Sequence, residues 1–257
     1  MSVGASARLA FDHLVVAARS IGEGVAWCEA ELGVVPAAGG KHPLMGTHNR
    51  LVNVGSVRYP RSFLEIVAVD PDAPAPGRPR WFDLDGEATR AALASGPKLV
   101  QWVARTDAID ASLVALRAAG LALADPNAAE RLTARGLLRW RIALMADGSR
   151  PAGGALPLLI EWGGEHPCDS LPTSAVVLEQ VELAGVSASL ATMLGVDAAP
   201  TMSSIDGSGI SEAEAEAEAE DAPSLRGTAG TTTAAGIIVV LRTPIGLRRL
   251  SSPPSTG

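Results

Sequence analysis

The segment FDHLVVAARSIGEGVAWCEAELGV, residues 11–34, predicts a β-strand followed directly by a helix. Apolar residues dominate 11–17, as in a buried strand. The helix is expected over 21–32, and Gly33 is a typical helix stop. Its apolar face has the spacing i, i+3, i+7 at Val25, Cys28 and Leu32. Aliphatic residues predict further strands at 34–37, 49–54 and 62–69. Together these elements form a β-α-β-β-β unit.

A second unit with a similar order of elements follows the proline-rich stretch DPDAPAPGRP, residues 70–79. Its expected elements are a strand at 99–104, a helix at 108–119 and strands at 137–144 and 156–162. Matching polar positions are separated by 101 − 13 = 88 and 161 − 65 = 96 residues. Such self-similarity indicates a duplicated module.

The chain therefore divides into four expected parts. These are a first module at 9–70, a proline-rich linker at 71–97, a second module at 98–170 and a partial third module at 171–257. The last part contains an acidic low-complexity run at 203–223, which is typical of a solvated insertion.

Composition excludes several classes of function. The 257 residues are 47% apolar, which is ample for a core, and the net charge of −7 with no basic run argues against nucleic-acid binding. Residues 1–10 show neither a signal peptide nor a membrane span, so the cytoplasm is the expected location. Cys28 and Cys168 have the spacing of neither a disulfide framework nor a structural zinc site.

Four expected strands each carry one metal-competent side chain: His13, Glu65, Gln101 and Glu161. Because side chains alternate along a strand, each lies on an otherwise apolar face. An unpaired buried carboxylate costs several kcal/mol, and these strands contain no lysine or arginine. A divalent metal is the simplest partner. The alternative is a salt-bridged pocket in which arginines from elsewhere reach the carboxylates, namely Arg105, Arg139 and Arg141.

These segments resemble the vicinal oxygen chelate superfamily, specifically proteins with a glyoxalase-like domain. The resemblance covers roughly residues 9–170. It is carried by FDHLVV (11–16), GVAWCEAELGV (24–34), GTHNRL (46–51), FLEI (63–66), RWFD (80–83) and LLIEW (158–162). It implies an α+β fold of tandem βαβββ modules whose sheets curl around a shared cleft that holds a metal.

The resemblance also implies a site. The superfamily's metal ligands fall on His13, Glu65, Gln101 and Glu161, a set that favours Zn, Ni, Co or Mn over iron. The implied enzyme is a metal-dependent lyase or isomerase that stabilises an enediolate of a small carbonyl compound. Glu161, or else Glu65, would be the base. Cleft-bordering candidates for substrate positioning are His48, Asn49 and Arg50, which could instead form a turn and a solvated strand edge.

Two other functions remain open at this point. The first is a non-catalytic protein of the same fold that sequesters a small molecule. The second is an interaction role centred on the acidic run, in which case deletion of residues 203–223 would abolish activity. Two modules in tandem favour a cleft within one chain, in a monomer or a homodimer.

Overall fold

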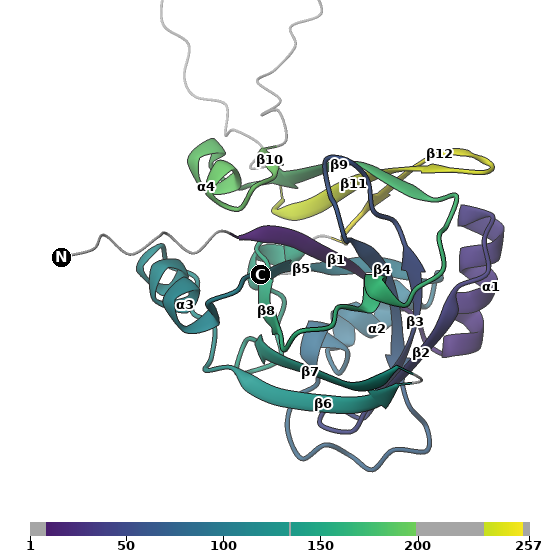
Figure 1. Ribbon diagram of the computed structural model, residues 1–257, viewed down its shortest axis with the longest axis horizontal. Coiled ribbons are helices and arrows are strands. Elements are labelled where there is room, and N and C mark those ends of the chain that lie inside the picture. The colour runs from purple at the N-terminus through teal and green to yellow at the C-terminus, as the bar shows by residue number, and fades with distance from the viewer. Residues whose placement is uncertain (1–8, 134, 199–233, 254–257) are drawn as a thin grey trace, which may run out of the picture.

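The computed structural model describes residues 9–133, 135–198 and 234–253 (Figure 1). It contains a curled eight-stranded sheet and a smaller four-stranded sheet, mixed with few helices. The strand order is β2-β3-β4-β1-β5-β8-β7-β6 in the larger sheet and β10-β9-β11-β12 in the smaller one. The expected α+β fold of tandem βαβββ modules with a partial third module is confirmed.

The elements of the first module are β1 (Ala10–Ala17), α1 (Ile21–Leu32), β2 (Ala37–His42), β3 (Thr47–Asn53) and β4 (Phe63–Val69). Those of the second module are β5 (Lys98–Arg105), α3 (Ile109–Ala118), β6 (Asn127–Thr133), β7 (Gly136–Ala143) and β8 (Leu158–Trp162). Between them lie a 3-10 turn (Trp81–Asp83) and α2 (Glu87–Leu93). The third part contains β9 (Val177–Ala184), α4 (Ala188–Met193), β10 (Asp197–Ala198), β11 (Gly236–Thr243) and β12 (Gly246–Ser251).

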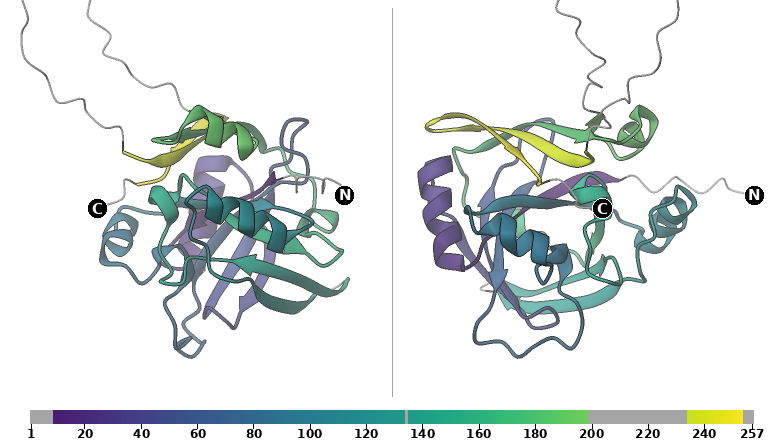
Figure 2. Two further views of the ribbon diagram at one scale, coloured as in Figure 1. Left: turned by 90° about the vertical axis from the view of Figure 1, so that its left-hand side faces the viewer. Right: turned by 180° about the vertical axis from the view of Figure 1, so that it is seen from behind.

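The two modules meet at an antiparallel pair formed by β1 and β5. Within each module the first strand runs parallel to the last, so β1 pairs with β4 and β5 pairs with β8. The remaining strands are antiparallel neighbours in the same order on both sides. Helix α1 packs on β4 and α3 on β8, both outside the curl (Figure 2).

The two edges of the curled sheet approach each other where β2 faces β6. A Cβ on Gly40 of β2 would lie 2.4 Å from Nη1 of Arg131 on β6. At the neighbouring Gly39 a Cβ would lie 2.0 Å from Oδ1 of Asn49. The glycines are therefore needed for the close approach of these two side chains.

Local signals account for most of the elements. Ser20 caps α1 by accepting a hydrogen bond from Glu23 N at 3.2 Å, and Gly33 ends the helix with a φ of 70°. The helix lies where its periodicity predicted.

The smaller sheet packs on the outer face of β1 and β5 (Figure 1). There Phe11 stacks on Trp102 at 5.6 Å, and Tyr59 Oη accepts a hydrogen bond from Val181 N.

Two expected strand assignments need correction, and the expected linker gains a helix. Strand β2 lies at Ala37–His42 and not at 34–37, because its sequence AAGGKH lacks the aliphatic residues on which the prediction relied. Strand β6 was not predicted, since its inner positions include Asn127, Arg131 and Thr133. The expected linker contains α2. The acidic run at 203–223 lies outside the described residues.

Helices in the described ranges are all too short or too polar to cross a membrane.

Candidate functional site

The inner face of the curled sheet encloses a small cavity of about 40 Å³. Its polar lining comes from five different strands: His13 of β1, His42 of β2, Asn49 of β3, Glu65 of β4 and Arg131 of β6. The rest of the lining is apolar and rich in aromatic rings: Leu51, Phe63, Trp81, Phe82, Leu138, Trp140, Ile142, Ile160, Trp162 and Pro167. A few convergent polar groups within apolar walls are typical of a ligand site.

Glu65 lies at the centre of this polar group and is 5% exposed. Its Oε1 accepts a hydrogen bond from Asn49 Nδ2 at 2.6 Å, and its Oε2 lies 3.7 Å from His13 Nε2. A third side chain, His42, has its Nε2 at 3.8 Å from Oε1. The first module therefore supplies a buried carboxylate together with two imidazoles.

Asp12 holds the opposite side of the His13 ring. Its Oδ1 lies 2.5 Å from His13 Nδ1, and its Oδ2 lies 3.0 Å from His166 Nε2 and accepts from Trp162 Nε1 at 3.1 Å. Burial by itself raises the pKa of Asp12, but the hydrogen bonds and charges of His13 and His166 outweigh burial and hold that pKa well below its usual range. The ionised carboxylate therefore orients His13 with Nε2 towards Glu65.

His42 is a neutral imidazole in this cavity. Burial lowers its pKa to about 4, although the charge of Glu65 acts in the opposite direction. Its Nδ1 lies 3.0 Å from Thr47 Oγ1 and its Nε2 lies 3.3 Å from Asn49 Nδ2. These partners fit the tautomer in which Nδ1 donates and Nε2 accepts.

The structure corrects the expected placement of Glu161. Val15 of β1 pairs with Glu65, and Val103, its counterpart in the second module, pairs with Leu158. Leu158 therefore occupies the position equivalent to Glu65. Glu161 lies three residues further along β8, and an odd displacement turns a side chain to the opposite face of the sheet.

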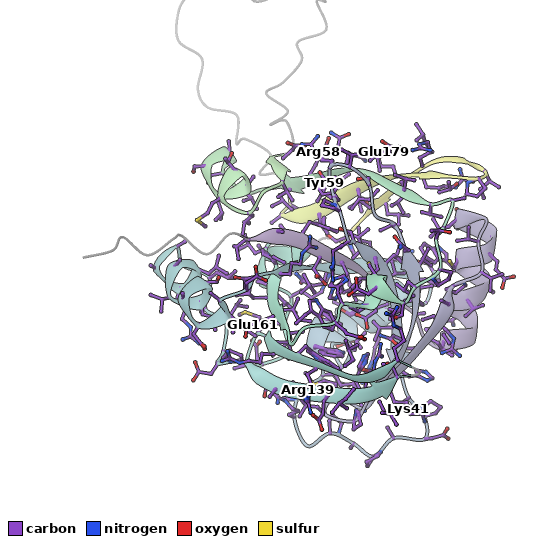
Figure 3. All side chains as sticks on the ribbon, in the orientation of Figure 1. Lys41, Arg58, Tyr59, Arg139, Glu161 and Glu179 are labelled. Carbon is purple, nitrogen blue, oxygen red and sulfur yellow. The ribbon has the colours of Figure 1, made fainter. Side chains whose placement is uncertain are left out.

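Glu161 is consequently on the outer face. Its Oε1 accepts a hydrogen bond from Ile109 N, and its Oε2 accepts one from Arg141 Nη1, both at 3.1 Å. It borders an outer hollow of about 670 Å³ that also contains Arg139, and Figure 3 shows the two labelled residues on the side of β7 and β8. The salt-bridge alternative thus holds for Arg141 and Glu161, whereas Arg139 pairs with Glu130 and Arg105 donates to Phe11 O.

Gln101 is fully buried but does not join His13 and Glu65 through its amide nitrogen. Nε2 donates to the carbonyl oxygens of Leu156 at 2.6 Å and Trp102 at 2.9 Å. Its Oε1 has no hydrogen-bond partner in the described part of the chain. Gln101 pairs with Val15 in the sheet, which makes it the diagonal neighbour of His13. This placement agrees with the offset of 88 residues between His13 and Gln101.

Only two of the four expected metal ligands, His13 and Glu65, face each other. Across residues 9–133, 135–198 and 234–253, no three His, Cys, Asp or Glu side chains are arranged to hold a metal ion. The donor set of this cavity therefore does not fit the expected four-ligand centre.

The expected substrate-positioning residues are divided by strand alternation. Asn49 is buried and lines the cavity, whereas its neighbours His48 and Arg50 point to the other face of β3. Arg50 Nη1 donates to the backbone oxygen of Asn49.

Sequence reasoning missed Asp12, His42 and Arg131. The adjacency of Asp12 to His13 was a usable signal, because a carboxylate commonly orients a functional imidazole. His42 and Arg131 lie on the two strands whose position or existence was not predicted, so their direction could not be derived.

Paired βαβββ modules curled around a cavity with a buried polar group define the vicinal oxygen chelate fold. Residues 11–196 match the family described as a glyoxalase-like domain, and the chain belongs to this family.

Several solved structures are similar to the chain at low sequence identity. A hypothetical protein from Staphylococcus aureus is 17% identical with a TM-score of 0.50, over 73% of this chain and 75% of that one. Methylmalonyl-CoA epimerase from Mycobacterium tuberculosis is 18% identical with a TM-score of 0.37, over 63% and 91%. The Streptomyces coelicolor epimerase, in complex with 2-nitronate-propionyl-CoA, is 14% identical with a TM-score of 0.40, over 61% and 96%. None of the curated proteins compared matches the chain.

Proposed function

We propose that this protein is a glyoxalase-like enzyme of the lyase or isomerase type, which moves a proton at a carbon next to the carbonyl group of a small molecule. One observation carries the proposal: His13 Nε2 and Glu65 Oε2 face each other at 3.7 Å in a largely apolar cavity. Each side chain is held from behind, His13 by Asp12 and Glu65 by Asn49.

Glu65 is the base in this mechanism. Asn49 holds Oε1, so Oε2 is the oxygen that accepts the proton from carbon. The electrons of the broken C–H bond move into the carbonyl group and form an enolate. His13 donates a proton from Nε2 to the developing oxyanion, and the Asp12 carboxylate stabilises the imidazolium that does so. Return of the proton to carbon gives an isomer, and loss of a leaving group gives the lyase outcome.

The divalent metal implied by the family resemblance is not used in this mechanism, because Gln101 and Glu161 do not converge on His13 and Glu65. Metal analysis by plasma mass spectrometry tests separately whether the protein binds a divalent metal. Near-stoichiometric Zn, Ni, Co or Mn in the wild type that is lost in Glu65→Ala would show that a smaller ligand set suffices.

The second candidate is a non-catalytic protein that sequesters a small molecule. The observation that favours it is the incomplete ligand set around a cavity that is otherwise built for binding. In this case the cavity binds carbonyl compounds and leaves their C–H bonds unchanged.

Deuterium incorporation separates the two functions. Small 2-oxo acids, 2-oxoaldehydes and 1,2-diketones are incubated with the protein in D₂O, and exchange at carbon is followed by proton NMR. We expect exchange that falls at least about 100-fold in Glu65→Gln and His13→Gln, the scale of a lost acid or base. Glu161→Gln is the matched control and retains exchange, because Glu161 pairs with Arg141 outside the cavity. Binding without exchange would favour sequestration, and loss of exchange in Glu161→Gln alone would overturn the assignment.

A further inference from the structure

Arg131 is a cation at the boundary between two spaces. It lines the inner cavity with Glu65 and also borders an adjoining groove of about 390 Å³ between β2 and β6. Leu51, Leu138 and Pro167 border the same two spaces, so the groove lies directly beside the cavity. The volume of the groove lies within the range of small-molecule sites.

The guanidinium of Arg131 has no carboxylate within ion-pair distance among the described residues. Its nearest polar contact is Asn49 Oδ1 at 3.5 Å, and that oxygen already accepts a shorter hydrogen bond from Gly40 N at 2.7 Å. Burial lowers the pKa of Arg131, and the charge of Glu65 acts in the opposite direction. Because arginine stays protonated in proteins, a half-buried guanidinium favours an anion beside it.

A residue that lines the cavity carries a buried donor with no partner among the described residues. Trp81 is 5% exposed, and its Nε1 has no hydrogen-bond partner in the described ranges. A buried donor with no acceptor carries a free-energy cost that a bound acceptor removes. Arg131, Trp81 and further aromatic side chains line the space next to His13 and Glu65.

We infer that the substrate is a small 2-oxo carboxylic acid with an apolar, aromatic-sized body, whose carboxylate binds Arg131. This inference rests on the proposed function, since it names the substrate class of the same site. A monoanion fits better than a phosphate. Arg131 carries one positive charge, and the nearby carboxylate of Glu65 disfavours a second negative charge on the ligand. Because the inner cavity of about 40 Å³ is too small for an aromatic ring, the apolar body lies in the adjoining groove of about 390 Å³.

The reaction on such a substrate balances without a further reactant. The bond between C3 and its hydrogen breaks, the proton passes to Glu65, and the electron pair forms the double bond between C2 and C3. The C2 oxygen takes a proton from His13 and the product is the enol. Reversal in D₂O places deuterium at C3.

Phenylpyruvate and its methyl ester are the probes, since they differ in the charge of the carboxyl group. Isothermal titration calorimetry measures binding to the full chain and to Arg131→Met, with Arg139→Met as the matched control on the outer face of β7. We expect Arg131→Met to bind phenylpyruvate about ten- to a hundredfold more weakly, the scale of a lost charged hydrogen bond, and to bind the ester unchanged. Arg139→Met behaves as the wild type. Should Arg131→Met fail to fold, Arg131→Lys replaces it, with an intermediate loss expected because lysine lacks the bidentate geometry.

Failure of the inference and failure of the proposed function have different signatures. Equal binding of acid and ester, equal binding by Arg131→Met, or no binding of either probe overturns the carboxylate inference. Exchange with neutral carbonyl compounds would then leave the proposed function intact. Conversely, Arg131-dependent binding of phenylpyruvate with no deuterium at C3 supports the inference and overturns the proposed reaction.

Discussion

Asn49 Nδ2 donates a 2.6 Å hydrogen bond to Glu65 Oε1, and the same nitrogen lies 3.3 Å from His42 Nε2. The other end of the amide, Oδ1, accepts from Gly40 N at 2.7 Å. One side chain of β3 therefore connects β2 with β4 and holds the carboxylate in place. This contact ties the stability of the inner face to the geometry of the proposed base.

Replacement of Asn49 by aspartate places a second carboxylate beside Glu65. We expect Asn49→Asp to lower the free energy of unfolding by about 3 kcal/mol at pH 8, the cost of an uncompensated buried charge. Part of that loss is recovered at pH 5, because one of the two carboxyl groups then takes up a proton. Urea unfolding at both pH values measures the effect. Asn53→Asp is the control, since its Oδ1 accepts from Gly55 N and a carboxylate can do the same. Equal destabilisation at the two pH values would contradict the prediction.

Asp12 gives a prediction for both activity and acid stability. Asp12→Asn removes the charge that stabilises the imidazolium of His13, so we expect deuterium exchange to fall about 100-fold or more.

The same carboxylate gives a prediction for stability in acid. The folded-state pKa of Asp12 lies below the unfolded value near 3.8. Its contribution to stability is therefore fully present above about pH 4 and is lost as the pH falls further. We expect the difference in unfolding free energy between wild type and Asp12→Asn to shrink on acidification from pH 5 to pH 3. A difference that stays constant over this range would exclude the ionised Asp12.

Periodicity and repetition were sufficient for the framework of the fold. The strand pattern predicted that His13 and Gln101 occupy equivalent positions in the two modules. The structure agrees, because Val15, two residues after His13, pairs with Glu65 on one side and with Gln101 on the other. The helix at Ile21–Leu32 was predictable because its cap, apolar face and glycine stop all lie in one local segment.

The candidate site depended on information that is not local. Residues 158–162 were correctly expected to form a strand, yet the face that Glu161 occupies is set by the pairing of Val103 with Leu158. An apolar run buried on both sides carries no alternation from which this register can be derived. Arg131 and His42 reach the cavity because the sheet curls until β2 approaches β6, a property of the whole sheet and not of either strand.

His42 predicts a further pH dependence of stability. Burial lowers its pKa from 6.5 to about 4, so the unfolded chain binds a proton between these values that the folded chain does not. The contribution of His42 is fully present above pH 6.5 and is lost as the pH falls towards 4, by about 3 kcal/mol at 1.4 kcal/mol per pKa unit. We expect His42→Gln to show a flatter decline of unfolding free energy over this range in urea titrations. A decline as steep as that of the wild type would mean that His42 is protonated in the folded state.

The two glycines of β2 separate effects on stability from effects on binding. In Gly39→Ala the new Cβ would lie 2.4 Å from the backbone oxygen of Asn49, so strand β3 must move. We expect a loss of about 2 kcal/mol, as for an overpacked core site. In Gly40→Ala the nearest atom is Arg131 Nη1, the mobile end of a long side chain, and the loss should stay below about 1 kcal/mol.

Displacement of Arg131 in Gly40→Ala should nevertheless weaken the binding of phenylpyruvate and leave that of its ester unchanged. Urea unfolding and calorimetry on the same samples measure both effects. Gly22→Ala is the control, because a Cβ there meets nothing within 4 Å and alanine favours the helix by about 0.5–1 kcal/mol. If Gly40→Ala binds phenylpyruvate as tightly as the wild type does, the prediction is wrong. The position of the Arg131 guanidinium at the ligand's carboxylate would then not depend on the space beside Gly40.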